Sequence, residues 1–518
     1  MSRQHFSSRA FVPALVGVLA ALPGAAWAQS EPVSSFGDDG TQLTEFFDDG
    51  TQELRAMVVQ LDPATGRAKL VAAGTAAPTL GDGHFALARY ERDGTPDRSF
   101  GAAETGRVIT NFSVVRPEPP SLLDISSDAN AVAVDRRQRV LAAGQVIFAG
   151  ATVNCRFAVA RYTADGRPDT TFGDLGRVST DVNSACDTAS AVVEQALPRT
   201  GLLSLPQARV VAGGTSGDPG TPASASSDSR FTLIGYHGGD ALSGRRAGTL
   251  DASFGSGGIA RSPHFVQRVT LDPAPPFADS VRLRVPITST FDRLYALATQ
   301  SDGKLIAVGS GKFSGIEQPV IARYTLDGSL DTSFADGGAR VLAPSGRVLA
   351  VRVGSGDELF VSGRSTLSVS SASGGSDVAT FVSHLGPDGE LDPRFGTGGV
   401  GVTNVSVARA GGSPGFETVA AGLVVLPSGQ ILLGGSSSDS RAPFSSVFTL
   451  VRWTTDGQLD RNFGVDGVLR RTESNPRVNY AAAAAARLPD GRVVVGADSN
   501  RVRRTPPPAL SWALAAFE

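Results

Sequence analysis

The sequence predicts an all-β protein that repeats one four-stranded unit, and two observations carry this prediction. A motif of Asp, two variable residues, Phe and then Gly or Ala occurs six times, 61 to 82 residues apart. The chain also holds 61 Gly and 31 Pro among 518 residues, a turn-rich composition typical of many short strands. A period of this length indicates one supersecondary unit used repeatedly. The six copies are Asp97–Gly101, Asp169–Gly173, Asp251–Gly255, Asp331–Ala335, Asp392–Gly396 and Asp460–Gly464.

The first half of each unit reads as two apolar strands joined by a tight turn. Pairs such as Asp302-Gly303, Ser428-Gly429 and Asp490-Gly491 separate apolar runs of strand length. This arrangement is the strongest short-range signal for a β-hairpin. We name these two strands A and B.

The second half of each unit reads as strands C and D. In a C strand such as Phe157–Tyr162, side chains alternate between two faces. A pair such as Asp165-Gly166 opens the C–D turn, where Gly supplies positive φ and Asp bonds nearby amides. The Phe of the motif is expected to pack beneath that turn, with Gly relaxing the backbone before strand D. The residues given this structural role are Phe36, Asp97, Phe100, Asp169, Phe172, Asp251, Phe254, Asp331, Phe334, Asp392, Phe395, Asp460 and Phe463.

A sheet of four antiparallel strands that needs neighbouring units to bury both of its faces is typical of a β-propeller blade. A seventh unit, 479–518, has strands A to C but no D. Its missing D strand occurs instead at 33–46, around an isolated Phe36-Gly37. We therefore predict one seven-bladed propeller over 29–518, closed by its N-terminal strand so that no edge stays open. The run Ala481–Ala486 favours helix by propensity, but its repeat register predicts strand A. The six complete units span 54–112, 127–182, 188–262, 290–343, 346–404 and 416–471.

The order Phe-x-x-x-Arg-Tyr, Asp-Gly, Asp-x-x-Phe-Gly resembles the delta-60 repeat family of secreted bacterial proteins, over nearly the whole mature chain. The resemblance implies a repeat protein without an assigned catalytic activity. The chain departs from the pattern at His384-Leu385, where Arg-Tyr is usual, and at Gly235-Tyr236. The C–D loop of the third unit is also lengthened by Ala241–Gly248.

Residues 1–28 have the pattern of a secretory signal peptide. Arg3 and Arg9 precede the apolar stretch Phe11–Leu22, and Ala26-Trp27-Ala28 forms the cleavage site. Export to the periplasm or the exterior is therefore expected. Removing two Arg and no acid changes the formal net charge from -3 to -5. No basic run could neutralise a phosphate backbone, and no other segment approaches ~20 continuous apolar residues, so neither nucleic acid nor a membrane span is predicted.

Cys155 and Cys186 are the only cysteines. Cys155 lies just before strand C of the second unit and Cys186 follows strand D of the same unit, so antiparallel pairing brings them together. In an oxidising compartment such a pair forms a stable disulfide. The alternative is two unpaired thiols. A redox centre is not expected, because no Cys-x-x-Cys spacing exists.

The sequence predicts no catalytic, cofactor or metal site. After the predicted signal peptide, four histidines remain, at 84, 237, 264 and 384; they lie apart and accompany no nucleophile or metal-ligand spacing. Carboxylates recur in pairs in the C–D turns, as Asp93 and Asp97 illustrate. We interpret them as turn caps, because two carboxylates fall short of the 6–8 oxygens that Ca²⁺ takes; a calcium ladder is the alternative. The other pairs are Asp165 and Asp169, Asp327 and Asp331, and Asp456 and Asp460.

Loop lengths point to one end of the propeller as the binding face. The B–C and D–A connections share an end and vary most, whereas turns at the opposite end are short and stereotyped. We expect a binding module for a protein or a surface glycan at this face. One alternative is a hydrolase or lyase in the central funnel, which converging carboxylates and histidines would favour and a lining of Val, Ala and Ser would oppose. Another is a structural envelope or adhesive protein. The expected binding loops are 75–84, 215–230, 263–289, 364–378 and 436–444.

Overall fold

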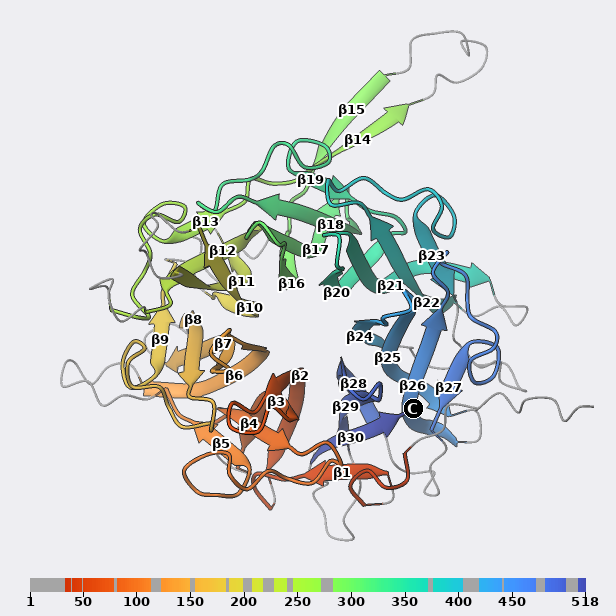
Figure 1. Cartoon of the computed structure of the whole chain (residues 1–518). Coiled ribbons are helices and arrows are strands. Elements are labelled where there is room, and N and C mark those ends of the chain that lie inside the picture. The colour runs from red at the N-terminus through yellow and green to blue at the C-terminus, as the bar shows by residue number, and fades with distance from the viewer. Residues whose placement is uncertain are drawn as a thin grey trace, which may run out of the picture.

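Seven four-stranded antiparallel sheets stand around a common axis and form a seven-bladed β-propeller (Figure 1). In the residues that this computed structural model describes, all regular secondary structure is β. Strand A of each blade lies innermost and strand D outermost, as the repeat predicts. The described residues are 33–38, 40–48, 50–78, 82–112, 123–149, 154–182, 186–198, 207–217, 228–239, 246–271, 283–370, 376–403, 419–439, 442–471, 480–499 and 511–518.

The blades follow one another in chain order, each with strands A to D. Blade 1 holds β2 (Thr51–Leu61), β3 (Ala68–Ala77), β4 (His84–Tyr90) and β5 (Arg107–Thr110). Blade 2 holds β6 (Leu123–Val134), β7 (Val140–Ala149), β8 (Asn154–Tyr162) and β9 (Arg177–Thr180). Blade 3 holds β10 (Thr188–Leu197), β11 (Gln207–Gly217), β12 (Ser229–His237) and β13 (Ile259–Arg261). Blade 4 holds β16 (Arg293–Thr299), β17 (Leu305–Phe313), β18 (Ile316–Tyr324) and β19 (Ala339–Val341).

The remaining blades complete the circle. Blade 5 holds β20 (Gly346–Val353), β21 (Leu359–Ser370), β22 (Ser376–Leu385) and β23 (Val400–Thr403). Blade 6 holds β24 (Val419–Val425), β25 (Ile431–Asp439), β26 (Ala442–Trp453) and β27 (Val468–Arg470). Blade 7 holds β28 (Tyr480–Arg487), β29 (Val493–Ser499), β30 (Ser511–Phe517) and β1 (Thr41–Thr44). The alanine run therefore forms strand β28, so the repeat register overrides helix propensity.

The N-terminal strand closes the ring, which confirms the prediction. Strand β1 pairs antiparallel with β30, from Thr41 opposite Ala515 to Thr44 opposite Trp512. The Val33 N–H also donates to the Ala516 carbonyl over 2.9 Å. Phe36 is 1% exposed and belongs to the apolar cluster shared by blades 7 and 1.

Five motif Phe rings pack against the Asp-Gly turn of the next blade, whereas the sequence placed each Phe beneath the turn of its own blade; they are Phe36, Phe100, Phe254, Phe334 and Phe395. Phe100 of blade 1 lies against Gly166 of blade 2, where an added Cβ would come within 2.6 Å of its ring. The Gly101 N–H donates to the Asp165 carbonyl across the same junction, over 2.8 Å. Phe36 lies against Gly94 in the same way at the closing junction. The alternation of side chains along one strand cannot reveal this contact, because the contact joins residues of two neighbouring blades.

A buried arginine joins the same junctions. Arg161 pairs with Asp169 at 2.8 Å, lies over the Phe172 ring, and donates to the Gly238 carbonyl of blade 3. Arg89 and Arg323 do the same in blades 1 and 4. This buried charge is tolerated because it is paired and hydrogen-bonded.

Blade 3 lacks that arginine on strand C, and strand B supplies a replacement. Arg209 of β11 pairs with Asp251, lies over Phe254 and donates to the Leu326 carbonyl of blade 4. A Cβ at Gly235 would come within 2.8 Å of the Arg209 side chain, so the Gly makes the room that Arg209 fills. In blade 5, His384 takes the arginine position and lies 3.4 Å from Asp392.

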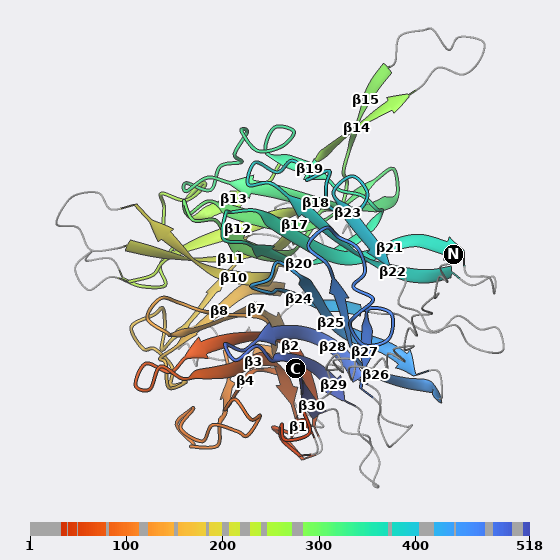
Figure 2. The same ribbon diagram turned by 45° about the vertical axis from the view of Figure 1, so that its right-hand side comes forward.

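A hairpin projects from the ring between blades 3 and 4 (Figure 2). It consists of β14 (Val266–Leu271) and β15 (Leu283–Thr288), whereas the sequence predicts only a long connection at 263–289. The base of the hairpin is tied to the ring by His264, whose two ring nitrogens contact Asp228 and Asp292. Asp292 is buried and also accepts a hydrogen bond from Ser289.

Candidate binding site at the loop end of the ring

Every innermost strand carries a β-bulge near its loop end, that is, the end with the B–C and D–A connections. In blade 1 the bulge lies between Leu54 and Ala56, opposite Gly74 of β3. A Cβ at Gly74 would come within 1.9 Å of the Glu53 carbonyl, so glycine permits this close approach. The extra residues of the seven bulges are Arg55, Asn130, Ser190, Tyr295, Leu349, Ala421 and Ala483.

Just beyond each bulge, one cross-strand pair of strands A and B faces the loop end. These seven pairs occupy equivalent positions, yet their residues differ from blade to blade. We call them the variable ring. Its pairs are Glu53/Thr75, Asp128/Gln145, Thr188/Thr215, Arg293/Ser310, Arg347/Arg364, Val419/Ser436 and Ala481/Asp498.

Charge is ordered around the variable ring. Blades 7, 1 and 2 contribute Asp498, Glu53 and Asp128, which are acidic. Blades 4 and 5, across the ring, contribute only basic residues and a serine. Blades 3 and 6 contribute no charged residue. The charged residues of the variable ring are therefore acidic on one side and basic on the other.

Hydrogen bonds between neighbouring blades hold the variable ring in place. Thr75 of blade 1 donates to Asp128 of blade 2 over 3.0 Å. Thr215 of blade 3 accepts the Leu294 N–H of blade 4 over 3.2 Å. Such contacts fix the polar groups before any ligand arrives, which lowers the entropy cost of binding.

At the junction of blades 7 and 1, which closes the ring, the interblade hydrogen bond is accepted by a carboxylate. Asp498 accepts the Leu54 N–H over 2.5 Å. Burial raises the pKa of Asp498 to about 7; the Leu54 hydrogen bond and the Arg55 charge oppose this rise, while the Glu53 charge adds to it. Asp498 is therefore a group that changes charge near neutral pH.

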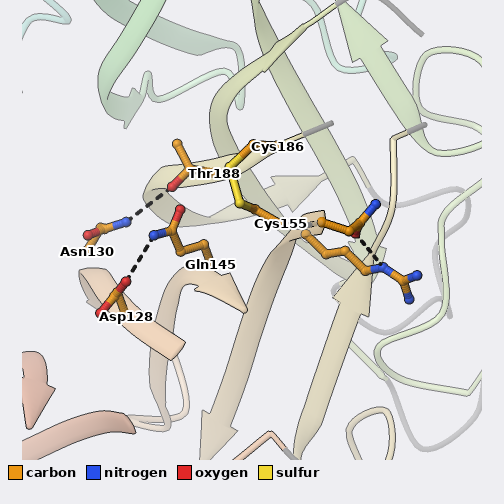
Figure 3. Close-up of a disulfide and its surroundings, with 8 residues drawn as sticks. Asp128, Asn130, Gln145, Cys155, Cys186 and Thr188 are labelled. Atoms are coloured by element: carbon orange, nitrogen blue, oxygen red, sulfur yellow. Dashed lines mark hydrogen bonds between the residues drawn. A yellow bond between two sulfur atoms is a disulfide. The ribbon is translucent and has the colours of Figure 1, made fainter. Parts of the chain in front are cut away.

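The predicted disulfide is present and stands beside the variable ring (Figure 3). Cys155 and Cys186 are joined with Cα atoms 4.2 Å apart, closer than the ~5.5–6 Å typical of disulfides. The bond ties the start of β8 to the segment that leads into β10. Close by, Gln145 donates to Asp128 over 2.9 Å, and Asn130 donates to Thr188 of the next blade over 3.4 Å.

The predicted turn carboxylates lie at the opposite end and serve their own turns and blades. Asp97 contacts Arg89 and Lys69, and Asp93 accepts from Thr95. Burial alone raises the pKa of Asp97, but hydrogen bonds from Lys69 and Ser99 and the Arg89 charge lower it to about 2. Among the described residues, no group of three His, Cys, Asp or Glu could hold a metal ion.

The histidines do not converge. His84 lies on β4, His237 on β12 and His384 on β22, while His264 ties the projecting hairpin. On the innermost strands, the partly buried Val58, Val132 and Val193 pack against the apolar clusters between blades.

The loops expected to bind a ligand lie partly outside the described residues. Segments 79–81, 218–227, 272–282, 371–375 and 440–441 are among those that the structure does not describe. Residues 1–28, the predicted signal peptide, also lie outside them. Within the described part of the chain, no helix is long and apolar enough to cross a membrane.

Three stretches of the chain match the family model described as "Domain of unknown function (DUF5122) beta-propeller". They are residues 69–100, 144–172 and 300–334, which cover strands B and C and the Asp-x-x-Phe motif of blades 1, 2 and 4. The match supports a propeller repeat family, and the delta-60 repeat resemblance stays a prediction. No curated protein matches this sequence.

Solved structures match this chain only at very low sequence identity. A protein of unknown function from Dyadobacter fermentans DSM 18053 has 10% identity and a TM-score of 0.34, covering 92% of this chain and 99% of that one. The polysaccharide lyase Uly1 has 9% identity and a TM-score of 0.38, covering 90% and 89%. A GH43_1 enzyme from Xanthomonas citri, solved with xylose, has 9% identity and a TM-score of 0.26, covering 63% and 86%. At these values the likeness carries no argument about function.

The bulges and the variable ring are what sequence reasoning misses. One signal for them is in the chain: a glycine interrupts most B strands after an apolar run, as Gly144 and Gly214 do. An isolated glycine inside a strand pattern indicates a bulge or a close backbone approach.

Proposed function

We propose that this protein is an exported binding module that holds its ligand at the loop end of the ring, against the variable ring. The observation that carries the proposal is the contrast between the two ends of the blades. At the turn end, equivalent positions repeat the Arg, Asp and Phe contacts in blades 1, 2 and 4, and blades 3 and 5 change only the basic residue. At the loop end, equivalent positions differ from blade to blade while their backbone geometry stays the same. In a repeat protein, positions that the fold does not hold constant are available for recognition.

The chemistry at the loop end suits a polar ligand such as a surface glycan. Hydroxyl and amide groups of Thr75, Gln145, Thr188 and Thr215 are half-buried and are held by hydrogen bonds within and between blades. Such groups give orientation and specificity at binding sites. Export is supported by the pattern of residues 1–28 and by the disulfide, which persists in oxidising compartments.

A loop exchange tests the proposal. The mature chain is screened against an array of neutral, carboxylated and sulfated oligosaccharides, and against extracted surface proteins. Residues 218–227 and 371–375 are then replaced by short Gly-Ser segments, which leaves the described strands intact. The matched control replaces the A–B turn at 63–66, which lies at the opposite end.

We expect the loop exchange to abolish binding of whichever array member the parent chain binds, with an unchanged far-UV spectrum. The turn exchange should leave affinity unchanged. Retained affinity in the folded loop exchange, or loss of affinity in the turn control alone, would contradict binding at the loop end.

A further inference from the structure

A cavity lies on the rim of the ring, where β1 of blade 7 stands beside blade 1 (Figure 1). Its volume is about 440 Å³, which is within the range of pockets that hold small molecules. One wall is formed by β1 and the residue that follows it. The other wall is formed by strand C and the C–D turn of blade 1. The cavity is therefore built by the closure of the ring.

The wall from blade 1 contains an insertion that the other blades lack. The segment between the motif Phe and strand D is Gly101–Gly106 in blade 1, and its Glu104 and Thr105 line the cavity. The same segment has four residues in each of the other six blades, so the fold does not require the two extra residues of blade 1. The shorter segments are 37–40, 173–176, 255–258, 335–338, 396–399 and 464–467.

Two opposite charges line the cavity without contacting each other. Arg98 and Glu104 are exposed, and neither side chain has an ion pair or a hydrogen bond with any described residue. Arg107, in contrast, donates to the Glu45 carbonyl and so joins the two walls. A neutral ligand would take water from both free charges and return no opposite charge. A small molecule with one positive and one negative group matches them better.

The buried part of the lining is apolar except for one pair of hydroxyls. Ala88 is 1% exposed and Leu43 is partly buried. Thr44 and Tyr90 share a hydrogen bond of 2.7 Å that uses only one of their two hydroxyl hydrogens; the other has no acceptor among the described residues. Burial raises the pKa of Tyr90, although the Thr44 hydrogen bond and the Arg107 charge oppose the rise, so the phenol stays protonated at neutral pH. The lining thus offers an aliphatic surface and one hydroxyl donor.

We propose that this cavity binds a free α-amino acid with an apolar side chain. Arg98 pairs with the carboxylate, and a guanidinium can do so through two parallel hydrogen bonds. Glu104 pairs with the ammonium group, and the side chain of the ligand packs against Leu43 and Ala88. This site goes beyond the proposed function, because it lies on the rim and takes a different class of ligand from the variable ring.

Calorimetry with matched ligands tests the assignment. The probes are leucine, N-acetylleucine, leucine amide and glucose, each titrated into the mature chain. N-acetylleucine keeps the carboxylate and removes the ammonium charge, whereas leucine amide keeps the ammonium and removes the carboxylate. We expect leucine to bind about tenfold or more tightly than either derivative, as the loss of one charge-assisted hydrogen bond predicts. Glucose should not bind at the rim.

Point variants assign each charge to its partner. Glu104→Gln should weaken leucine and leucine amide about tenfold and leave N-acetylleucine unchanged. Arg98→Gln should weaken leucine and N-acetylleucine by a similar factor and leave leucine amide unchanged. Both side chains are exposed, so both variants should fold. Arg394→Gln is the control, because that side chain is 87% exposed and lies in the C–D turn of blade 5. It should change no affinity.

A deletion tests the insertion itself. Removing Ala102 and Ala103, which are exposed, gives blade 1 the four-residue segment of the other blades. We expect this variant to lose leucine binding with an unchanged far-UV spectrum. If it does not fold, the two point variants decide the question.

The outcomes separate this site from the one at the loop end. The assignment is overturned if leucine does not bind, or if N-acetylleucine, leucine amide or glucose binds as tightly as leucine. Leucine binding that survives both point variants also refutes it. Replacing 218–227 and 371–375 should leave leucine affinity unchanged, and its loss there would move the ligand away from the rim. Failure of any of these tests leaves the proposed function at the variable ring standing.

Discussion

The N-terminal strand should stabilise the whole ring, and Phe36 is the residue that measures its contribution. Phe36 is 1% exposed and packs with Tyr90, Trp512 and the alanines of β28. The perturbation is Phe36→Ala. Its matched control is Phe100→Ala, which removes the same contact at a junction inside the continuous chain.

The size of the effect follows from burial. A buried Phe→Ala substitution costs about 3–5 kcal/mol, and both variants should fall in this range if both junctions are equally closed. Starting the chain at residue 50 additionally removes the β1–β30 ladder and the Thr44–Tyr90 hydrogen bond of 2.7 Å. That bond alone contributes about 1 kcal/mol, so the truncated chain should be less stable than Phe36→Ala.

The assay is unfolding in guanidinium chloride, followed by far-UV circular dichroism and by tryptophan fluorescence. Trp512 lies opposite Thr44 and reports on the closing blade directly. Coincident transitions show that the ring unfolds as one unit. If Phe36→Ala costs less than about 1 kcal/mol while Phe100→Ala costs several, or if the truncated chain unfolds like the mature chain, the closure does not hold the ring together.

Two further predictions concern the disulfide and the closing junction. Alkylation of the unfolded, unreduced mature protein should add no mass in an intact-mass measurement, and two alkylated thiols would disprove the bond. Replacing Cys155 and Cys186 with serine should lower the free energy of unfolding by about 3–4 kcal/mol, by the loop-entropy model for a 31-residue separation. Asp498→Asn should become increasingly stabilising as pH rises. The folded pKa of Asp498 is about 7 against 3.8 for an ordinary Asp, so the stability that its protonated form contributes is present below pH 3.8 and lost as pH rises through 7. At 1.36 kcal/mol per pH unit the difference reaches at most about 4 kcal/mol, and parallel stability–pH curves for the two chains would contradict it.

The sequence by itself determines the architecture, because the information is local and repeated. A hairpin signal, a period-two strand and an Asp-Gly turn recur often enough to define strands A to D in six units. The isolated Phe36-Gly37 then identifies the strand that completes the seventh. Cys155 and Cys186 could be paired on the same basis, since antiparallel neighbours in one blade bring them to one end.

Only the tertiary structure decides which blades touch through which residues. Phe100 packs beneath Gly166 of the next blade. Arg209 of strand B takes the place of the strand C arginine where blade 3 has Gly235. Strand alternation relates neither pair of positions. The bulges shift the register by one residue and so create the variable ring, whose order of charge emerges when the seven blades stand in a circle. Local patterns specify each blade, whereas the geometry of the closed ring specifies the junctions where these contacts and the proposed site lie.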